Sequence, residues 1–293
     1  MKTIYYFNII YACNSKCVFC FSHNTKHNCT THRSIPISNF KSYVQSRELS
    51  PFDRVIINGG EPLLHPQIIE ILSLLCKIGC EVLIYTNGRL LSQFDFSYLT
   101  DKFRFIVPIH GDNLTHDNIT HIKGSYYETI QGLIHLSKYK VLIDIKIIIN
   151  SLMLTDHKII EIMAEDILKI RNLNSIHLTT MAETRVSKKN NVSPVDRSYS
   201  SFLTGKIFNL LFQRVNSIKL FDTCILEIPV VNYVDSIDHR TVFFKDNEYE
   251  WEYVIEKHAG CSKICKFAYC CHSAVKDFTV LEYSNGKFFR NLE

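Results

Sequence analysis

The stretch Cys13-Asn14-Ser15-Lys16-Cys17-Val18-Phe19-Cys20 decides the fold, because it directly follows the apolar segment Ile4–Ile10. Three thiols with CxxxCxxC spacing can bind one cuboidal iron–sulfur cluster and leave its fourth iron without a protein ligand. Chance would place this spacing in about one such cysteine-rich sequence in a hundred. A zinc or structural thiol site is the alternative, and its fourth ligand would come from the residues nearby, His23, His27, Cys29 or His32.

Short apolar segments alternate with helical patterns from Ile4 to about Thr180, which is typical of repeated βα units around a parallel sheet. Six such units with right-handed crossovers curl into an open barrel, whose ligand site lies at the carboxyl ends of the strands. The sequence therefore predicts an α/β fold, a partial (β/α)6 TIM-like barrel of parallel strands. The expected strands are Ile4–Ile10, Arg54–Asn58, Glu81–Thr86, Arg104–Ile109, Leu142–Ile149 and Ser175–Thr180.

Three helices carry recognisable boundaries. Pro66 is expected to open a helix that ends at Gly79, and a further helix is expected from Asp156 to Ile170. Ser125 and Glu128 have the spacing of a capping box before the apolar positions of another helix.

The chain divides into three parts by composition. Residues 1–185 are expected to form the barrel, and the polar residues 186–223 to form a linker and helical connection. Residues 224–293 form a cysteine-rich region, which we expect to be a small auxiliary domain after the barrel.

Polar groups stand where the expected strands end. The second strand runs into Asn58-Gly59-Gly60-Glu61-Pro62, in which two glycines allow a close backbone approach to a ligand, while carboxylate and carbonyl oxygens can accept hydrogen bonds from an ammonium group. The next strands end in Thr86-Asn87-Gly88, in His110-Gly111-Asp112 and at Asn150. Each could instead be an ordinary turn or cap, so the prediction rests on the whole set.

Taken together, CxxxCxxC after the first strand and GGEP after the second resemble the radical SAM superfamily. The resemblance implies a 4Fe-4S cluster on Cys13, Cys17 and Cys20, with S-adenosylmethionine (SAM) on the open iron and Phe19 against its adenine. It also implies that the remaining strand-end residues contact SAM, namely Gly59, Gly60, Glu61, Pro62, Asn87, His110, Asp112 and Asn150.

The same resemblance implies an activity. The enzyme would reductively cleave SAM to a 5′-deoxyadenosyl radical, which abstracts hydrogen from a substrate, with electrons from a reductant such as flavodoxin or ferredoxin. Because this radical attacks almost any C–H bond, the barrel must position the substrate and exclude water. Whether the chain consumes or regenerates SAM is left open by the sequence.

Further cysteines stand near the carboxyl terminus. Cys224, Cys261, Cys265 and Cys271 could bind a second 4Fe-4S cluster, with Cys270 an alternative for the last. This region resembles the twitch or SPASM-like auxiliary domains of radical SAM peptide maturases, although its spacing departs from the best-known patterns. The alternatives are a structural zinc knot with His272, and a hydrogen-donating thiol such as Cys224 or Cys270.

The resemblance of this region to those auxiliary domains implies a ribosomally made peptide as the substrate. A dehydrogenase or epimerase acting on a sugar or nucleoside is the second hypothesis, and a non-catalytic iron–sulfur or zinc protein is the third. The cluster loop begins about a dozen residues into the chain, which leaves no room before it for a winged-helix leader-binding domain and weakens the peptide reading.

Composition limits the remaining classes. A net charge of +4 from 33 basic and 29 acidic residues gives no reason to expect nucleic acid. Eleven cysteines, an odd number, cannot all pair within one chain, and the amino terminus lacks the pattern of a secretory signal. We therefore expect a cytoplasmic protein, and the lack of a membrane-length apolar run argues against a membrane partner.

Overall fold

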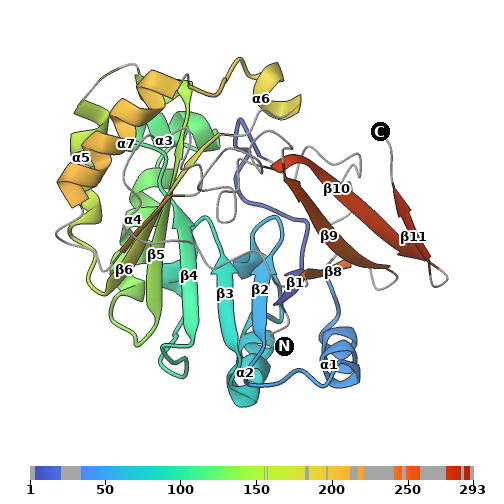
Figure 1. Ribbon diagram of the computed structural model, residues 1–293. Coiled ribbons are helices and arrows are strands. Elements are labelled where there is room, and N and C mark those ends of the chain that lie inside the picture. Colours follow the sequence, from blue (N-terminus) through green and yellow to red (C-terminus); the bar gives the residue numbers. More distant parts are fainter. Residues whose placement is uncertain are drawn as a thin grey trace.

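The computed structural model describes residues 4–20, 34–154, 156, 158–181, 185–195, 197–211, 217–220, 241–245, 249–257, 275–284 and 287–290 (Figure 1). The described strands form one sheet in the order β11-β10-β9-β8-β1-β2-β3-β4-β5-β6-β7. Neighbours from β1 to β7 are parallel, as expected for a chain of βα units. The bounds of these strands are β1 Ile4–Asn8, β2 Arg54–Asn58, β3 Glu81–Tyr85, β4 Phe103–Pro108, β5 Leu142–Ile149, β6 Leu173–Thr180 and β7 Ser217–Leu220.

The six expected parallel strands are thus confirmed, but the sheet does not stop with them. The strand β7 pairs in parallel with β6, and β8 pairs in parallel with β1 at the other side. Three antiparallel pairings then continue the sheet outward from β8, as Figure 1 shows at the right. The bounds of these added strands are β8 Thr241–Lys245, β9 Tyr249–Lys257, β10 Val275–Ser284 and β11 Lys287–Arg290.

Helices connect the parallel strands (Figure 1). The helix expected between Pro66 and Gly79 is α2, and Gly79 ends it in the left-handed conformation with φ of 76°, which glycine adopts without a steric penalty. The helix expected from Asp156 to Ile170 is the shorter α5. The helices are α1 Ile37–Ser46, α2 Ile68–Ile78, α3 Asn113–Thr120, α4 Ser125–Leu136, α5 Lys158–Ile167, α6 Arg185–Lys189 and α7 Arg197–Leu211.

The expected capping box at the start of α4 is wrong. Gly124 is the N-cap residue and Ser125 is already the first residue of the helix, with no side-chain cap bond. The hydroxyl of Ser125 donates to Asp117 Oδ1 at 2.9 Å, and the Glu128 carboxylate pairs with Arg89. Both side chains therefore serve tertiary contacts, which sequence spacing alone does not reveal.

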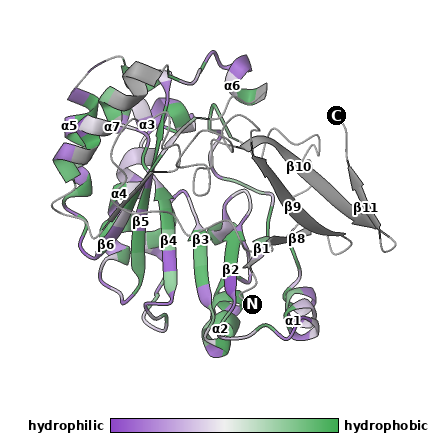
Figure 2. Ribbon diagram, in the orientation of Figure 1, coloured by the Kyte–Doolittle hydropathy of each residue, from purple (hydrophilic) through white to green (hydrophobic). Residues whose placement is uncertain are grey.

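The main core lies between the strands and the helices. In β5 the alternate residues Ile143, Ile145, Ile147 and Ile149 are fully buried in this core, as expected for side chains that point to one face of a sheet. Figure 2 shows the corresponding hydrophobic stretches along β2 to β5. The intervening residues Asp144 and Lys146 point to the other face, which carries polar side chains among apolar ones and is called the polar face below.

Ion pairs join neighbouring strands on this polar face near the amino ends. Arg54 opens β2 and makes two contacts with Glu81, the first residue of β3, at 2.9 and 3.2 Å. Arg104 of β4 binds Asp144 of β5 at 3.0 Å, and His177 of β6 reaches the same carboxylate at 3.0 Å. These contacts join β2 to β3, and they join both β4 and β6 to β5.

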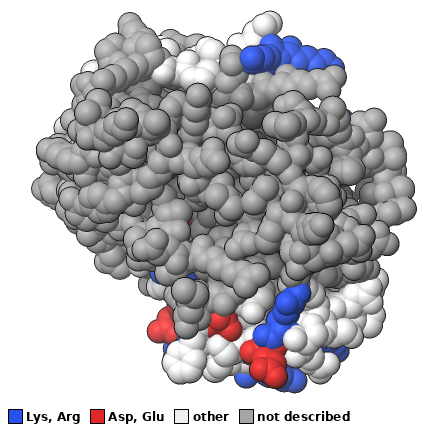
Figure 3. Space-filling model, turned by 45° about the vertical axis from the view of Figure 1, so that its right-hand side comes forward, with Lys and Arg blue, Asp and Glu red and all other residues white. Residues whose placement is uncertain are grey.

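The described surface bears charges of both signs. On the face drawn in Figure 3, acidic and basic side chains lie next to each other at the lower edge, and basic side chains stand apart at the upper edge. Within the described part of the chain, none of the helices combines the length and the apolar character needed to cross a lipid bilayer.

Candidate active site

The loop that carries the three cysteines is tied to two neighbouring parts of the barrel. The amide of Gly60 donates to the Ile10 carbonyl at 2.7 Å, and the amide of Glu61 donates to the Ala12 carbonyl at 2.8 Å. On the other side, Lys16 and Val18 donate to carbonyls at the end of α3 at 2.9 Å each. The cysteine loop therefore lies at the carboxyl ends of β1 and β2, where a parallel barrel binds its ligands.

The glycines of Gly59-Gly60 have a different role from the one expected. A methyl group on Gly59 would overlap the Ile10 carbonyl oxygen, and one on Gly60 would overlap the carbonyl oxygens of Tyr11 and Ala12. The close backbone approach that these glycines allow is thus to the cysteine loop of the same chain. Replacing either glycine would push this loop away from β2.

Cys13, Cys17 and Cys20 are half-buried and form no disulfide. Burial, with smaller contributions from nearby charges that include Cys20, raises the pKa of the Cys13 thiol to about 11 and that of the Cys17 thiol to about 12. Only the thiolate binds iron, so a bound cluster must displace these protons.

The three thiols suit an iron–sulfur cluster. A cubane carries an iron at each of four corners, so three thiolates around it need not meet at one point. Cys13, Cys17 and Cys20 lie on one short loop and can supply three such ligands, which leaves one iron open. The residues considered as a fourth zinc ligand, His23, His27, Cys29 and His32, lie outside the described part of the chain.

Glu61 is a buried brace between strand ends. Its side chain is fully buried and accepts three hydrogen bonds, from Leu63 N at 3.0 Å, Thr86 Oγ1 at 2.6 Å and Asn87 N at 2.7 Å. Burial raises the pKa of this carboxyl, and the hydrogen bonds oppose that shift. These contacts all belong to the protein itself, and the contact of Glu61 with a ligand ammonium stays a prediction.

Pro62 follows as the first residue of a short 3-10 helix, Pro62–Leu64. Glu61 caps this helix, since its carboxylate accepts from the amide of Leu63. Pro62 is itself buried. The Glu-Pro pair thus turns the chain sharply at the end of β2 and fixes the carboxylate toward β3.

Asn87 links the end of β3 to the cysteine loop. Its side-chain amide donates to Asn14 Oδ1 at 2.6 Å and lies 3.3 Å from Ser15 Oγ. The Glu61 carboxylate holds the backbone of Asn87 in turn. The predicted site residues Glu61 and Asn87 therefore come together with the loop, in one continuous network of hydrogen bonds.

His110 lies at the end of β4, next to Phe19 of the cysteine loop. The two rings meet edge to face, with centroids 5.2 Å apart, and both are buried. The Nδ1 atom of His110 is buried with no hydrogen-bond partner in the described structure. Burial, followed by the charges of His116 and Lys146, holds the His110 pKa well below its usual range, so the ring is a neutral group with one polar atom available to a ligand.

Asp112 and Asn150 make mainly local contacts. Asp112 is the N-cap of α3, where its carboxylate accepts from Thr115 N at 2.9 Å. Asn150 is fully buried and bonds the Ile148 carbonyl at 2.8 Å and the Leu152 amide at 3.0 Å. Both residues stand at the expected strand ends, where their hydrogen bonds are those of a cap and a turn.

The candidates of the carboxyl-terminal region lie outside the described residues. These are Cys224, Cys261, Cys265, Cys270 and Cys271, together with His272. The second metal site therefore stays a prediction from the sequence.

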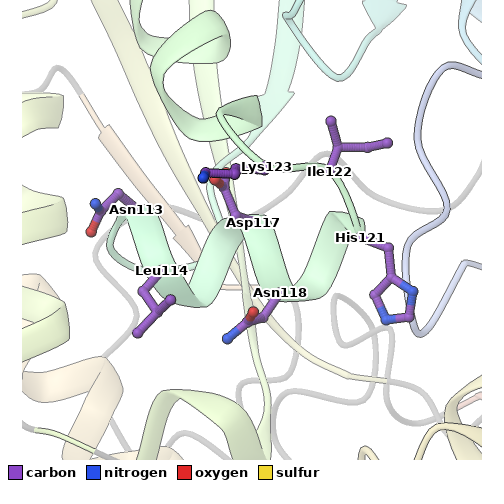
Figure 4. Close-up of a pocket in the computed structure, with 7 residues that line it drawn as sticks. All are labelled: Asn113, Leu114, Asp117, Asn118, His121, Ile122 and Lys123. Carbon is purple, nitrogen blue, oxygen red and sulfur yellow. The ribbon is translucent and has the colours of Figure 1, made fainter.

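A cavity of about 850 Å³ lies along α3 and the turn after it (Figure 4). Asp117 lines it, but its carboxylate is already bound to the Ser125 hydroxyl and the Tyr126 amide at 2.9 Å each. None of the three loop cysteines is among the described residues that line it, so we do not place the cluster there. The lining residues are Asn113, Leu114, Asp117, Asn118, His121, Ile122 and Lys123.

Comparison with known proteins agrees with this geometry. The family model described as "Radical SAM superfamily" matches residues 7–166, more than half of the chain, including the cysteine loop and the strands β2 to β5. The chain belongs to the radical SAM superfamily. It is therefore a radical SAM enzyme, and membership implies a 4Fe-4S cluster and SAM as cofactors.

Two curated relatives match parts of the chain. The 7-carboxy-7-deazaguanine synthase of Halobacterium salinarum is 36% identical over 78 residues, which are 27% of this chain and 29% of that protein. The subtilosin biosynthesis protein AlbA of Bacillus subtilis is 30% identical over 145 residues, which are 47% of this chain and 31% of that protein. The chain thus matches less than a third of the length of either relative.

A solved structure matches nearly the whole radical SAM chain. The protein anSMEcpe with bound AdoMet superposes with a TM-score of 0.64 at 14% identity, over 94% of this chain and 92% of that one. The same protein has also been solved with AdoMet and a peptide, Kp18Cys, and superposes with a TM-score of 0.60 at 14% identity, over 92% of this chain and 87% of that one. At this identity the likeness establishes the fold.

Several residues of the site escape a reading of the sequence. Arg89 and Asn14 lie in contact although 75 positions separate them in the chain. His116, whose Nδ1 accepts from the His110 amide at 3.2 Å, also carried no signal. The nearest sequence signal to Arg89 was the turn Thr86-Asn87-Gly88. This turn predicts the end of a strand, but it does not predict a role for the arginine that follows it.

Proposed function

We propose that the chain reductively cleaves SAM to a 5′-deoxyadenosyl radical, which abstracts hydrogen from a substrate peptide made on the ribosome. The observation that carries the proposal is the cysteine loop, fixed at the carboxyl ends of β1 and β2 by backbone hydrogen bonds to Gly60 and Glu61. Cys13, Cys17 and Cys20 would hold the cluster, which would supply the electron for SAM cleavage.

The protein's own contribution is position and protection. The Glu61 carboxylate holds the end of β3, and Asn87 holds the cysteine loop. Phe19 and His110 form a buried wall beside that loop, with the polar Nδ1 atom of His110 unpaired. We infer that this wall contacts SAM, and that Gly59, Gly60, Asp112 and Asn150 shape the remaining strand-end surface.

The peptide substrate is supported by two comparisons. AlbA is named for the biosynthesis of a bacteriocin, and anSMEcpe has been solved with a peptide bound. The carboxyl-terminal cysteines add a reason, because we propose that Cys224, Cys261, Cys265 and Cys271 bind a second 4Fe-4S cluster, with Cys224 or Cys270 as a possible thiol donor in place of a ligand. Flavodoxin or ferredoxin is the reductant we expect, in the cytoplasm.

A small-molecule substrate is the second candidate. The relative with 36% identity over its matched part is named as a synthase of 7-carboxy-7-deazaguanine, a nucleobase-like compound. Under this reading the same radical would dehydrogenate or epimerise a sugar or nucleoside. The two candidates share the cluster, the SAM site and the first chemical step.

The test begins with that shared step. Protein reconstituted under anaerobic conditions with iron and sulfide should release 5′-deoxyadenosine when given dithionite and SAM. No release from a protein with an intact cluster would contradict the proposed function. Adding candidate precursor peptides or nucleosides should then raise the release rate, and the class that does so identifies the substrate.

Iron and sulfide counts test the second site. About eight irons per chain would support two 4Fe-4S clusters, whereas about four irons with zinc would support the zinc knot. Replacing Cys265 by Ala should preserve abortive SAM cleavage and impair product formation. Full product yield from this variant would argue against a functional second cluster.

A further inference from the structure

Arg89 reaches from the end of β3 to the backbone between two cluster ligands. Its Nη1 atom donates to the Asn14 carbonyl and lies 3.3 Å from Ser15 Oγ. Asn14 and Ser15 stand between Cys13 and Cys17 in the chain. The guanidinium thus contacts the part of the loop that sets the spacing of the first two thiols.

The Arg89 side chain is fixed in this place. Its Nε atom binds the Glu128 carboxylate of α4 at 2.6 Å, and its amide donates to Asn87 Oδ1 at 3.1 Å. The Arg89 side chain is only 12% exposed, while that of Glu128 is 47% exposed. Water therefore screens the Arg89 charge less on the loop side than on the Glu128 side.

A fixed cation beside the loop has an electrical consequence. A cubane with three thiolate ligands becomes more negative by one charge when one electron enters it. Placing a guanidinium nearby, in a partly desolvated position, stabilises the reduced form more than the oxidised form. A guanidinium does not lose its proton in the neutral pH range, so this effect is permanent.

We propose that Arg89 is a positioning residue of the cluster, which fixes the loop between Cys13 and Cys17 and raises the cluster's reduction potential. The inference rests on the proposed function, because it requires the 4Fe-4S cluster on these cysteines. In the step concerned, one electron passes from the reductant to the cluster, and Arg89 neither gains nor loses a proton.

The experiment compares reconstituted Arg89→Gln and Arg89→Lys with the unchanged protein. Dithionite titration, followed by electron paramagnetic resonance, gives the midpoint potential of the cluster. At a fixed solution potential, we expect the ratio of reduced to oxidised cluster to fall about tenfold in Arg89→Gln, equivalent to about 59 mV for one electron. Arg89→Lys keeps the charge and should stay within about threefold of the unchanged protein.

Arg54→Gln is the matched control. It also removes an arginine that is paired with a glutamate, but at the amino end of β2, away from the cysteine loop. We expect its cluster potential and resonance signal to equal those of the unchanged protein. An equal shift in Arg54→Gln and Arg89→Gln would overturn the proposal, because the effect would then come from overall charge.

Two further outcomes would also overturn it. Arg89→Gln could carry a full cluster with an unchanged potential, or both Arg89 variants could shift equally, which would exclude the charge as the cause. If neither Arg89 variant retains iron, the variant Glu128→Gln tests the proposal, because it keeps Arg89 and removes the carboxylate that anchors it. An altered iron content or cluster potential in Glu128→Gln supports the proposal, and unchanged values overturn it. A lack of cluster in the unchanged protein would instead contradict the proposed function itself.

Discussion

The two ends of the parallel strands use charged and polar side chains in opposite ways. At the amino end they satisfy one another, as in Arg54 with Glu81 and Arg104 with Asp144. At the carboxyl end they brace loops, and two of the three buried side-chain atoms that lack a hydrogen-bond partner in the described structure lie there, Asn8 Oδ1 and His110 Nδ1, while the third is Tyr98 Oη. The ion pairs at the amino end stabilise the sheet, whereas the carboxyl end has polar atoms that a ligand could bind.

This difference assigns stability to one end and function to the other. In parallel barrels the carboxyl ends of the strands carry the ligand site, and the amino ends contribute to stability. Buried polar atoms without partners lower stability, so the two that lie beside the cysteine loop are candidates for contact with a ligand. Variants at the two ends should therefore separate loss of chemistry from loss of folding.

The largest expected effect is at the carboxyl end. Cys17→Ala should abolish SAM cleavage, because the cluster loses one of its three anchors. Loss of a residue that merely orients a metal ligand costs about 10- to 100-fold, so loss of the ligand itself should lower 5′-deoxyadenosine release by at least about 100-fold. The measurement is product release by the anaerobically reconstituted protein.

Cys76→Ala is the control for this variant. Cys76 is half-buried in α2, and its thiol donates to the Tyr98 carbonyl at 3.4 Å, outside the cysteine loop. This variant should keep its cluster and its SAM cleavage. Retained cleavage in Cys17→Ala, or equal loss in both variants, would contradict the assignment of the cluster to the loop.

At the amino end the expected effect is on folding. Asp144 is fully buried and binds Arg104, His177 and Asn174, the last at 2.8 Å. Asp144→Asn leaves the Arg104 charge without its buried counter-ion, which should lower the free energy of unfolding by about 4 kcal/mol. Urea unfolding measures this loss, while iron content per folded chain should stay unchanged. A loss of iron without a loss of stability would reverse the roles of the two ends.

The two ends of the parallel strands should lose stability at different pH values when the solution is acidified. Burial lowers the pKa of His116 to about 4, whereas an unfolded histidine titrates near 6.5. The unfolded chain therefore binds more protons between these values, and stability falls as the pH is lowered from about 6.5 to 4, by about 3 kcal/mol.

Asp144 acts in a lower pH range. Burial alone would raise the pKa of Asp144, but its bonds to His177, Asn174 and Arg104 outweigh burial and hold the pKa well below its usual range. Its contribution is therefore present above about pH 3.9 and is lost below it. Urea unfolding at several pH values should show His116→Asn to be flatter than the unchanged protein from pH 6.5 to 4. Equal slopes would contradict the buried, neutral state of His116.

Features that depend on residues close together in the sequence were predictable, and contacts between residues far apart in the sequence were not. The strands Arg54–Asn58 and Leu142–Ile149 were predicted residue for residue, because apolar runs between turn signals are local features. The cysteine loop was predictable for the same reason, since its three thiols lie within eight residues. Gly79 ended its helix as expected, because a left-handed cap is also a local demand.

The contacts between loops were not predictable. Glu61 was expected to face a ligand, but its carboxylate binds Thr86 and Asn87, 25 and 26 residues further along the chain. Ser125 and Glu128 had the spacing of a capping box, but Ser125 binds Asp117 and Glu128 binds Arg89. Such pairings depend on which strand ends meet, which one sequence does not specify. The pairing of β8 with β1 is a further case, because these strands lie at opposite ends of the chain.

The smallest expected effects come from two glutamates at opposite ends of adjacent strands. Glu61 follows the carboxyl end of β2, and Glu81 is the first residue of β3. Glu61→Gln keeps one acceptor oxygen for Leu63 and Thr86 but turns an amide group toward the Asn87 amide, leaving buried donors opposed. This should lower the free energy of unfolding by about 2 kcal/mol. Glu81→Gln weakens a pair whose side chains are 18% and 29% exposed, and should cost less than about 1 kcal/mol.

The two glutamate variants also differ in what else they change. Asn87 positions Asn14, so Glu61→Gln should disturb the cysteine loop and lower iron content, whereas Glu81→Gln should leave iron content unchanged. Urea unfolding and iron analysis on the same preparations separate the two effects. If Glu81→Gln lost as much iron as Glu61→Gln, the cluster would depend on the whole sheet, and the division between a stabilising end and a functional end would be wrong.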